Sequence, residues 1–323
     1  MRFTHYVTPL LLAASLLGIQ GTAMAAPRIV TSIKPLELLV HAIAPENTEV
    51  TSLVPAGASP HTYQMRPSQR RALADADRIF WVGPRMETFL ERLLSGEDFQ
   101  QRQVALWNES ADEGQDEEAH TAHEHDEMHP ADKPQDSHDH GHDHDHGEGE
   151  DPHLWLDPEM ALAMVREIQA QLAMLPGAQP AELAANVASF EQALRTAEAD
   201  IRQRLEAVRD ISLFTYHDAF RRFADHYGLE IQGVLTLNPE QSPGARHIAE
   251  LQQKLMTSQN VCLLTEPQFN RQWWRSITEG IHLVTSTWDP LASNIDASPR
   301  GYIEFQYAIA DAVLACLPEQ SQH

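Results

Sequence analysis

One stretch of the chain, from Pro180 to about Val208, keeps a helical spacing of apolar residues with no internal glycine or proline. At about 1.5 Å per residue such a helix spans roughly 40 Å, which is about the breadth of a two-lobed protein of this length. We therefore expect residues 179–210 to form a helix that connects two lobes. Its apolar positions are Leu183, Val187, Phe190, Leu194, Ile201 and Leu205.

Short apolar runs alternate with helical stretches on both sides of this helix, which predicts parallel sheets covered by helices. We expect an α/β fold with an N-terminal lobe at 26–178 and a C-terminal lobe at 211–323, a comfortable size for two domains. The expected strands are 28–33, 50–54, 79–82, 212–215, 231–237, 261–265 and 282–285. The expected helices follow Lys34, cover 68–76, run from Pro158 to about Leu175, and begin near Ala245, Arg271 and Tyr302.

Between Glu109 and Asp151 the chain carries nine of its eighteen histidines and seventeen carboxylates against one base, Lys133. Neutral imidazole suits zinc, copper, nickel and iron, and carboxylates attract cations. The segment has too little apolar surface to offset its ordering entropy, so we interpret it as a disordered loop that binds metal weakly. The alternative is a solvated acidic linker with incidental histidines. The histidines are His120, His123, His125, His129, His138, His140, His142, His144 and His146.

His125 and His129 have the spacing of the metalloprotease H-E-x-x-H motif. However, Asp stands where the motif has Glu, and the motif needs a stable helix.

The formal charge of -24 comes mostly from the same loop. Its seventeen acids minus Lys133 give -16, which leaves -8 for the rest. The rest of the chain is therefore ordinarily acidic, which argues against nucleic acid or an anionic membrane surface as a partner.

The first residues have the pattern of a secretory signal: Arg2, an apolar run over 9–19, and a small-residue site that ends at Ala25. We expect cleavage near Ala25 and, because no cysteine follows, a freely soluble periplasmic protein without a lipid anchor. A buried N-terminal helix is the alternative.

Cys262 and Cys316 suit an oxidising compartment. A bond between them would contribute roughly 4 kcal/mol of stability; two buried free thiols are the alternative.

Three histidines and one aspartate lie in loops, most of them soon after predicted strands. His61 follows the strand that ends at Val54, His217 follows 212–215, Asp289 follows 282–285, and His153 lies in a Pro-rich loop. Ligands of open α/β sheets bind beyond the carboxyl ends of the strands, so these side chains are candidates for one metal site. Taken alone, a histidine after a strand is more often a hydrogen-bonded loop residue than a metal ligand.

Five motifs, in this order, resemble those of the zinc-uptake substrate-binding proteins of ABC transporters. The resemblance covers essentially the whole chain after the signal, including the long helix and the histidine-rich loop. The motifs are Gly57-Ala-Ser-Pro-His61-Thr-Tyr-Gln-Met-Arg-Pro-Ser68, Asp151-Pro-His153-Leu-Trp-Leu-Asp-Pro158, Tyr216-His217-Asp-Ala-Phe220, Glu266-Pro-Gln-Phe269 and Trp288-Asp289-Pro-Leu291.

The resemblance implies two (β/α) lobes joined by one rigid helix, with a single Zn²⁺ in the interlobe cleft on His61, His153 and His217. It also implies a Cys262–Cys316 disulfide and delivery of the ion to a membrane ABC permease. Some zinc-binding members carry Glu just before the first histidine; this chain has Pro60, which leaves the fourth ligand open between Asp289 and water.

Three imidazoles with at most one carboxylate favour zinc, whereas manganese prefers more oxygen ligands. Manganese-binding relatives place a carboxylate where this chain has His217, so that residue favours zinc within the family. We therefore predict a monomeric periplasmic zinc receptor that performs no catalysis, with the histidine-rich loop as an accessory weak site. The alternatives are a secreted zinc enzyme, a periplasmic metal buffer that works through the loop, and a manganese or iron receptor.

Overall fold

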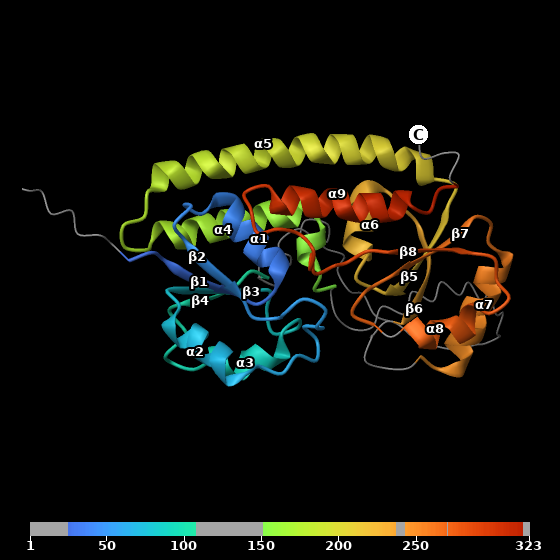
Figure 1. Ribbon diagram of the computed structural model, residues 1–323, viewed down its shortest axis with the longest axis horizontal. Coiled ribbons are helices and arrows are strands. Elements are labelled where there is room, and N and C mark those ends of the chain that lie inside the picture. Colours follow the sequence, from blue (N-terminus) through green and yellow to red (C-terminus); the bar gives the residue numbers. More distant parts are fainter. Residues whose placement is uncertain (1–24, 108–150, 237–242, 270, 319–323) are drawn as a thin grey trace, which may run out of the picture.

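The computed structural model describes residues 25–107, 151–236, 243–269 and 271–318. Two lobes, each with a parallel β-sheet, lie side by side under one long helix (Figure 1). The predicted signal segment and the histidine-rich loop fall outside the described residues, apart from Ala25 and Asp151 at their ends.

The N-terminal lobe has a four-stranded sheet in the order β2-β1-β3-β4, with all neighbours parallel. Strand β4 was not predicted, because it is three residues long and only half-buried, so it carries no alternating apolar pattern. The elements are β1 (Arg28–Thr31), α1 (Lys34–Ile43), β2 (Glu49–Ser52), α2 (Pro67–Asp75), β3 (Arg78–Trp81), α3 (Thr88–Leu94), β4 (Gln103–Ala105), η2 (Leu154–Leu156) and α4 (Pro158–Ala173).

The C-terminal lobe repeats this topology, with the order β6-β5-β7-β8 and parallel neighbours. The central strand β7 is buried along its whole length, as expected for a strand covered on both faces. The last predicted strand lies two residues further along the chain than expected. The elements are β5 (Ser212–His217), α6 (Arg221–Tyr227), β6 (Ile231–Thr236), α7 (Ala245–Thr257), β7 (Val261–Thr265), α8 (Arg271–Thr278), β8 (Val284–Thr287) and α9 (Gly301–Leu314).

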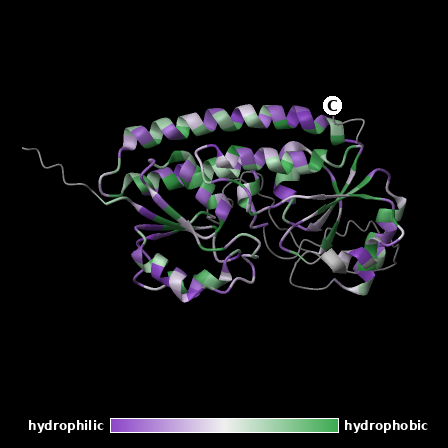
Figure 2. Ribbon diagram, in the orientation of Figure 1, coloured by the Kyte–Doolittle hydropathy of each residue, from purple (hydrophilic) through white to green (hydrophobic). Residues whose placement is uncertain are grey.

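The predicted connecting helix is α5 (Pro180–Leu205), which continues into the 3₁₀ turn η3 (Glu206–Val208). Its apolar positions are buried, and its outer face carries the polar residues (Figure 2). Helix α9 lies alongside α5 and reaches α1 of the first lobe, so a second helix also links the lobes. A Cβ on Gly301 would lie 2.8 Å from Leu38 Cδ2, so this close approach of α9 to α1 requires a glycine.

One hydrophobic core runs through both lobes and includes Ile29 and Leu38 of the first, Phe190 of α5, and Leu213 and Leu264 of the second. Because the core is continuous, the division of the chain into 26–178, 179–210 and 211–323 stays a prediction. Within the described residues, no helix is long and apolar enough to cross a membrane.

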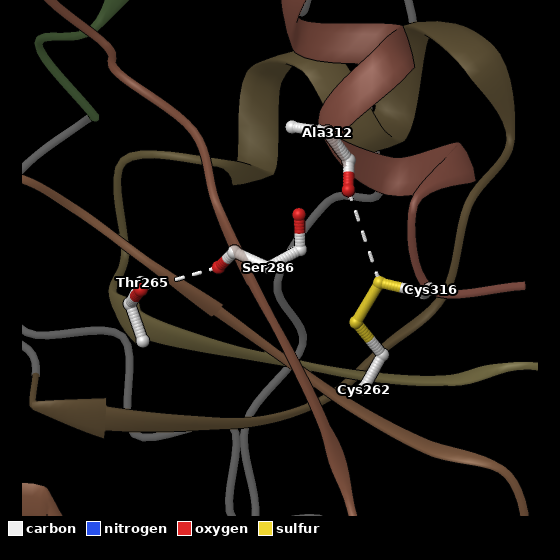
Figure 3. The surroundings of a disulfide bond; sticks show 5 residues. All are labelled: Cys262, Thr265, Ser286, Ala312 and Cys316. Atoms are coloured by element: carbon white, nitrogen blue, oxygen red, sulfur yellow. Dashed lines mark hydrogen bonds between the residues drawn. A yellow bond between two sulfur atoms is a disulfide. The ribbon is translucent and has the colours of Figure 1, made fainter.

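A disulfide joins Cys262 in β7 to Cys316, just after α9, with their Cα atoms 5.7 Å apart (Figure 3). The pairing implied by the family resemblance is confirmed, and the interpretation as two free thiols is wrong. The disulfide links the C-terminal end of α9 to strand β7 of the second sheet. It therefore helps to keep α9 in place, where the helix packs on both lobes.

Candidate metal centre

The structure brings His61, His153 and His217 together. One ring nitrogen of each lies within 4.8 Å of those of the other two, and the Nε2 atoms of His153 and His217 are 3.4 Å apart. His153 and His217 are buried, while His61 is partly exposed. Among the residues that the structure describes, this is the group of His, Cys, Asp and Glu side chains whose ligand atoms lie close enough to one another to hold a metal ion.

The three histidines come from three separate segments of the chain where the two lobes meet. His217 is the last residue of β5, and His61 follows β2 through a turn in which Gly57 has a φ of 78°. Both therefore lie at the carboxyl ends of parallel strands, as the sequence predicted. His153 precedes η2, which is fixed by two long-range bonds: Trp155 Nε1 donates to the carbonyl of Pro290 at 2.7 Å, and Tyr302 Oη donates to the carbonyl of Trp155 at 2.8 Å.

Two carboxylates orient the buried histidines from behind. His153 Nδ1 lies 2.6 Å from Asp151 Oδ1, and His217 Nδ1 lies 2.7 Å from Glu266 Oε1. A carboxylate on Nδ1 fixes the tautomer that leaves Nε2 free to bind a metal, and it makes the imidazole a stronger ligand. Sequence reasoning missed both roles: it counted Asp151 in the acidic loop and gave Glu266 no function, although the acid directly follows β7.

The site changes the basicity of two of its imidazoles. Burial, aided by the neighbouring His153 and His217, lowers the pKa of His61 to about 3. Burial also acts to lower the pKa of His217, but the charge of Glu266 and the hydrogen bond to it outweigh burial, so this pKa is raised. At neutral pH His61 is therefore an unprotonated nitrogen donor, whereas protons compete for His217.

Asp289 is not part of the three-histidine group. Its Oδ1 accepts hydrogen bonds from Gln268 Nε2 at 2.6 Å and from the backbone N–H of Leu291 at 3.0 Å. Its Oδ2 accepts from the backbone N–H of Ser293 at 2.8 Å. Both oxygens are therefore engaged in the turn that follows β8. The nine histidines of the acidic loop lie outside the described residues.

The three histidines line a small cavity of about 20 Å³. A water molecule needs about 10–15 Å³ of such volume, so the cavity has room for an ion and about one water. Trp155, Phe269 and Leu291 supply its apolar wall. Three nitrogen donors in a small, largely apolar cavity suit a four-coordinate divalent ion such as zinc. They suit an ion that prefers a larger shell of oxygen ligands less well.

Comparison with known proteins now places the chain. The family model described as "Zinc-uptake complex component A periplasmic", ZnuA, matches residues 29–316. The chain belongs to the ZnuA family. The resemblance seen in the five motifs is therefore confirmed, and the family description is that of a transport component.

Two members of the ZnuA family are similar over nearly their whole length. The high-affinity zinc uptake system protein ZnuA of Yersinia pestis is 34% identical, and the match covers 95% of this chain and 96% of that protein. The protein of the same name from Haemophilus ducreyi is 32% identical over 95% and 98% of the two chains. The fold agrees with a crystal structure of a 138–173 deletion mutant of ZnuA with zinc bound, at a TM-score of 0.67 and 23% identity, covering 89% of this chain and 98% of that one.

Proposed function

We propose that this protein is a periplasmic receptor that captures Zn²⁺ on His61, His153 and His217 and delivers it to a membrane ABC permease. The observation that carries this proposal is the convergence of three imidazoles, from three separate segments of the chain, on a cavity the size of an ion. Membership of the ZnuA family supports it, because the relatives carry the name of a high-affinity zinc uptake system.

The geometry supports reversible capture. His153 and His217 are buried and already oriented by Asp151 and Glu266, so little ordering entropy remains to be lost when the ion binds. His61 comes from the first lobe and is the more exposed of the three. The fourth position is left to water or to Asp289.

The proposal is tested by zinc titration against a competing chelator of known affinity. Replacement of His61, His153 and His217 by Ala together removes the tight site, while replacement of His41 and His282, which lie outside the cavity, leaves it intact. Growth in zinc-poor medium provides the functional readout. A triple variant that keeps one tight zinc per chain contradicts the assignment and favours a buffer that works through the loop.

The histidine-rich loop is proposed as an accessory segment that raises the local zinc concentration or reports zinc sufficiency through weaker sites. Deletion of residues 115–149 then lowers the total zinc stoichiometry but keeps the tight site. Unchanged stoichiometry together with unchanged uptake from zinc-poor medium contradicts this role and leaves a solvated linker.

A catalytic role is the weaker proposal, because the family model and the named relatives describe components of zinc uptake. We further propose that the protein is a monomer with no nucleic-acid partner, cleaved near Ala25 and free of a lipid anchor. Light scattering of the purified protein and N-terminal sequencing of the exported form check these points.

A further inference from the structure

Gln268 lies between the metal cavity and Asp289. It follows β7, lines the cavity with the three histidines, and donates from Nε2 to Asp289 Oδ1 at 2.6 Å. The reverse orientation of its amide would set two oxygens against each other, so the nitrogen must face the carboxylate. Gln268 is therefore the side chain that joins Asp289 to the wall of the cavity.

The hydrogen bonds of Asp289 leave little for a metal. A carboxylate oxygen has about two acceptor positions, and Oδ1 already accepts from Gln268 and from the N–H of Leu291. Both donors belong to residues that line the cavity, but only the bond from Gln268 comes from a side chain. Loss of its amide would free one acceptor position of Oδ1.

Two buried acceptors of the cavity wall lack a hydrogen-bond partner among the described residues. They are Gln268 Oε1 and Glu266 Oε2. A buried acceptor without a partner is costly, whereas a water bound to a metal carries two protons to donate. The number of unpaired acceptors thus equals the number of protons on a single bound water.

We propose that Gln268 decides the fourth ligand of the bound metal and thereby its selectivity; this rests on the proposed function of the three histidines. Its amide nitrogen holds Asp289 out of the shell, and its oxygen accepts a hydrogen bond from a water in the fourth position, while Glu266 Oε2 accepts the second hydrogen bond of that water. The shell stays at three nitrogens and one water, which suits zinc. A carboxylate that bound through both of its oxygens would raise the coordination number and favour manganese.

The test compares wild type with Gln268→Leu, which keeps the approximate size but cannot donate, using Co²⁺, Zn²⁺ and Mn²⁺ as the probes. In wild type, Co²⁺ gives the intense visible absorption of four-coordination. In Gln268→Leu the absorption weakens as Asp289 binds through both oxygens and raises the coordination number, and the ratio of zinc to manganese affinity falls roughly tenfold, the low end of effects seen for residues behind metal ligands. The double variant with Asp289→Asn restores the wild-type ratio.

Gln252→Leu is the matched control, because this glutamine of the same lobe donates to the carbonyl of Ile277 and does not line the cavity. A folded Gln268→Leu protein with the wild-type Co²⁺ spectrum and affinity ratio, changed only in melting temperature, overturns the proposal and leaves Gln268 as a support of the turn at Asp289. Failure of the receptor function is a different result: wild type itself then lacks a tight zinc site that depends on the three histidines.

Discussion

Nδ1 of His217 lies 2.7 Å from Oε1 of Glu266, and both side chains are almost completely buried. The carboxylate reaches the imidazole from the neighbouring strand, because β5 pairs with β7 in the second sheet. The ligand nitrogen on the far side of the ring is thus oriented by a residue 49 positions away in sequence. Loss of this partner is the most direct test of how the site is organised.

We predict that Glu266→Gln lowers zinc affinity by roughly 10–100-fold, the usual effect of removing a carboxylate behind a ligating histidine. The amide keeps the size of the side chain but removes its charge, so His217 becomes a weaker donor. Competition with a chelator of known affinity measures the change. Glu250→Gln, at an exposed acid of α7, is the control. Equal affinities for both variants and wild type contradict the role of Glu266.

Zinc affinity should rise with pH through a range set by His217. A metal displaces protons from its ligands, and the pKa of His217 is raised above its ordinary 6.5 while that of His61 is lowered to about 3. Below the pKa of His217 the ion must displace one proton from this histidine. This competition lowers the zinc affinity by about tenfold for each unit that the pH falls. Above it, this contribution vanishes. Isothermal titrations between pH 5.5 and 8.5 measure the slope, and a flat profile contradicts the ligand assignment.

Arg222 of α6 should support His153 indirectly. Its Nε and Nη2 donate to the carbonyl of Asp151 at 3.0 and 2.6 Å, and Asp151 in turn holds the imidazole. We expect Arg222→Ala to lower zinc affinity several-fold, toward the roughly tenfold low end of such effects, with partial recovery in Arg222→Lys. The neighbouring Arg221→Ala, which loses a part-buried pair with Asp218 and no bond to Asp151, serves as control. Identical affinities for Arg222→Ala and Arg221→Ala would rule the support out.

Gly301→Ala should destabilise the fold. The added Cβ would lie 2.6 Å from the carbonyl oxygen of Asp296 and 2.8 Å from Leu38 Cδ2, so backbone must move. Overpacking of this kind costs about 1–3 kcal/mol. Gly244→Ala is the control, because a Cβ there meets nothing within 4 Å. Urea unfolding of the two variants measures the difference, and equal midpoints would show that the contact between α9 and α1 can relax.

The Cys262–Cys316 disulfide closes a separation of 54 residues. Chain entropy predicts that it contributes roughly 4 kcal/mol. The double Cys→Ser variant, or wild type under reducing conditions, should unfold at correspondingly lower urea. The urea midpoint of the double variant should not change when the reductant is added. If the midpoint of wild type does not change either, the bond contributes no stability.

Much of the fold followed from local pattern. The long apolar repeat of α5 and the alternation of strands and helices predicted two parallel lobes and their connector, because burial of one helix face and of whole strands leaves a period in the sequence. Strand β4 was not predicted, because its three half-buried residues produce no periodic apolar pattern in the sequence. The contact of α9 with α1 escaped as well, since the sequence of a helix does not say which distant helix its buried face meets.

For the site, the sequence by itself predicted the histidines, because His61 and His217 follow strands and all three have recognisable motifs around them. Only the tertiary structure decided how they are used. Glu266 and Asp151 orient the ligands, and Gln268 and the turn at 289–293 engage Asp289. The bonds of Asp151 and of the turn at 289–293 are local. The bonds made by Glu266 and Gln268 join residues 49 and 21 positions apart, and their geometry exists only once the second sheet has brought those residues together.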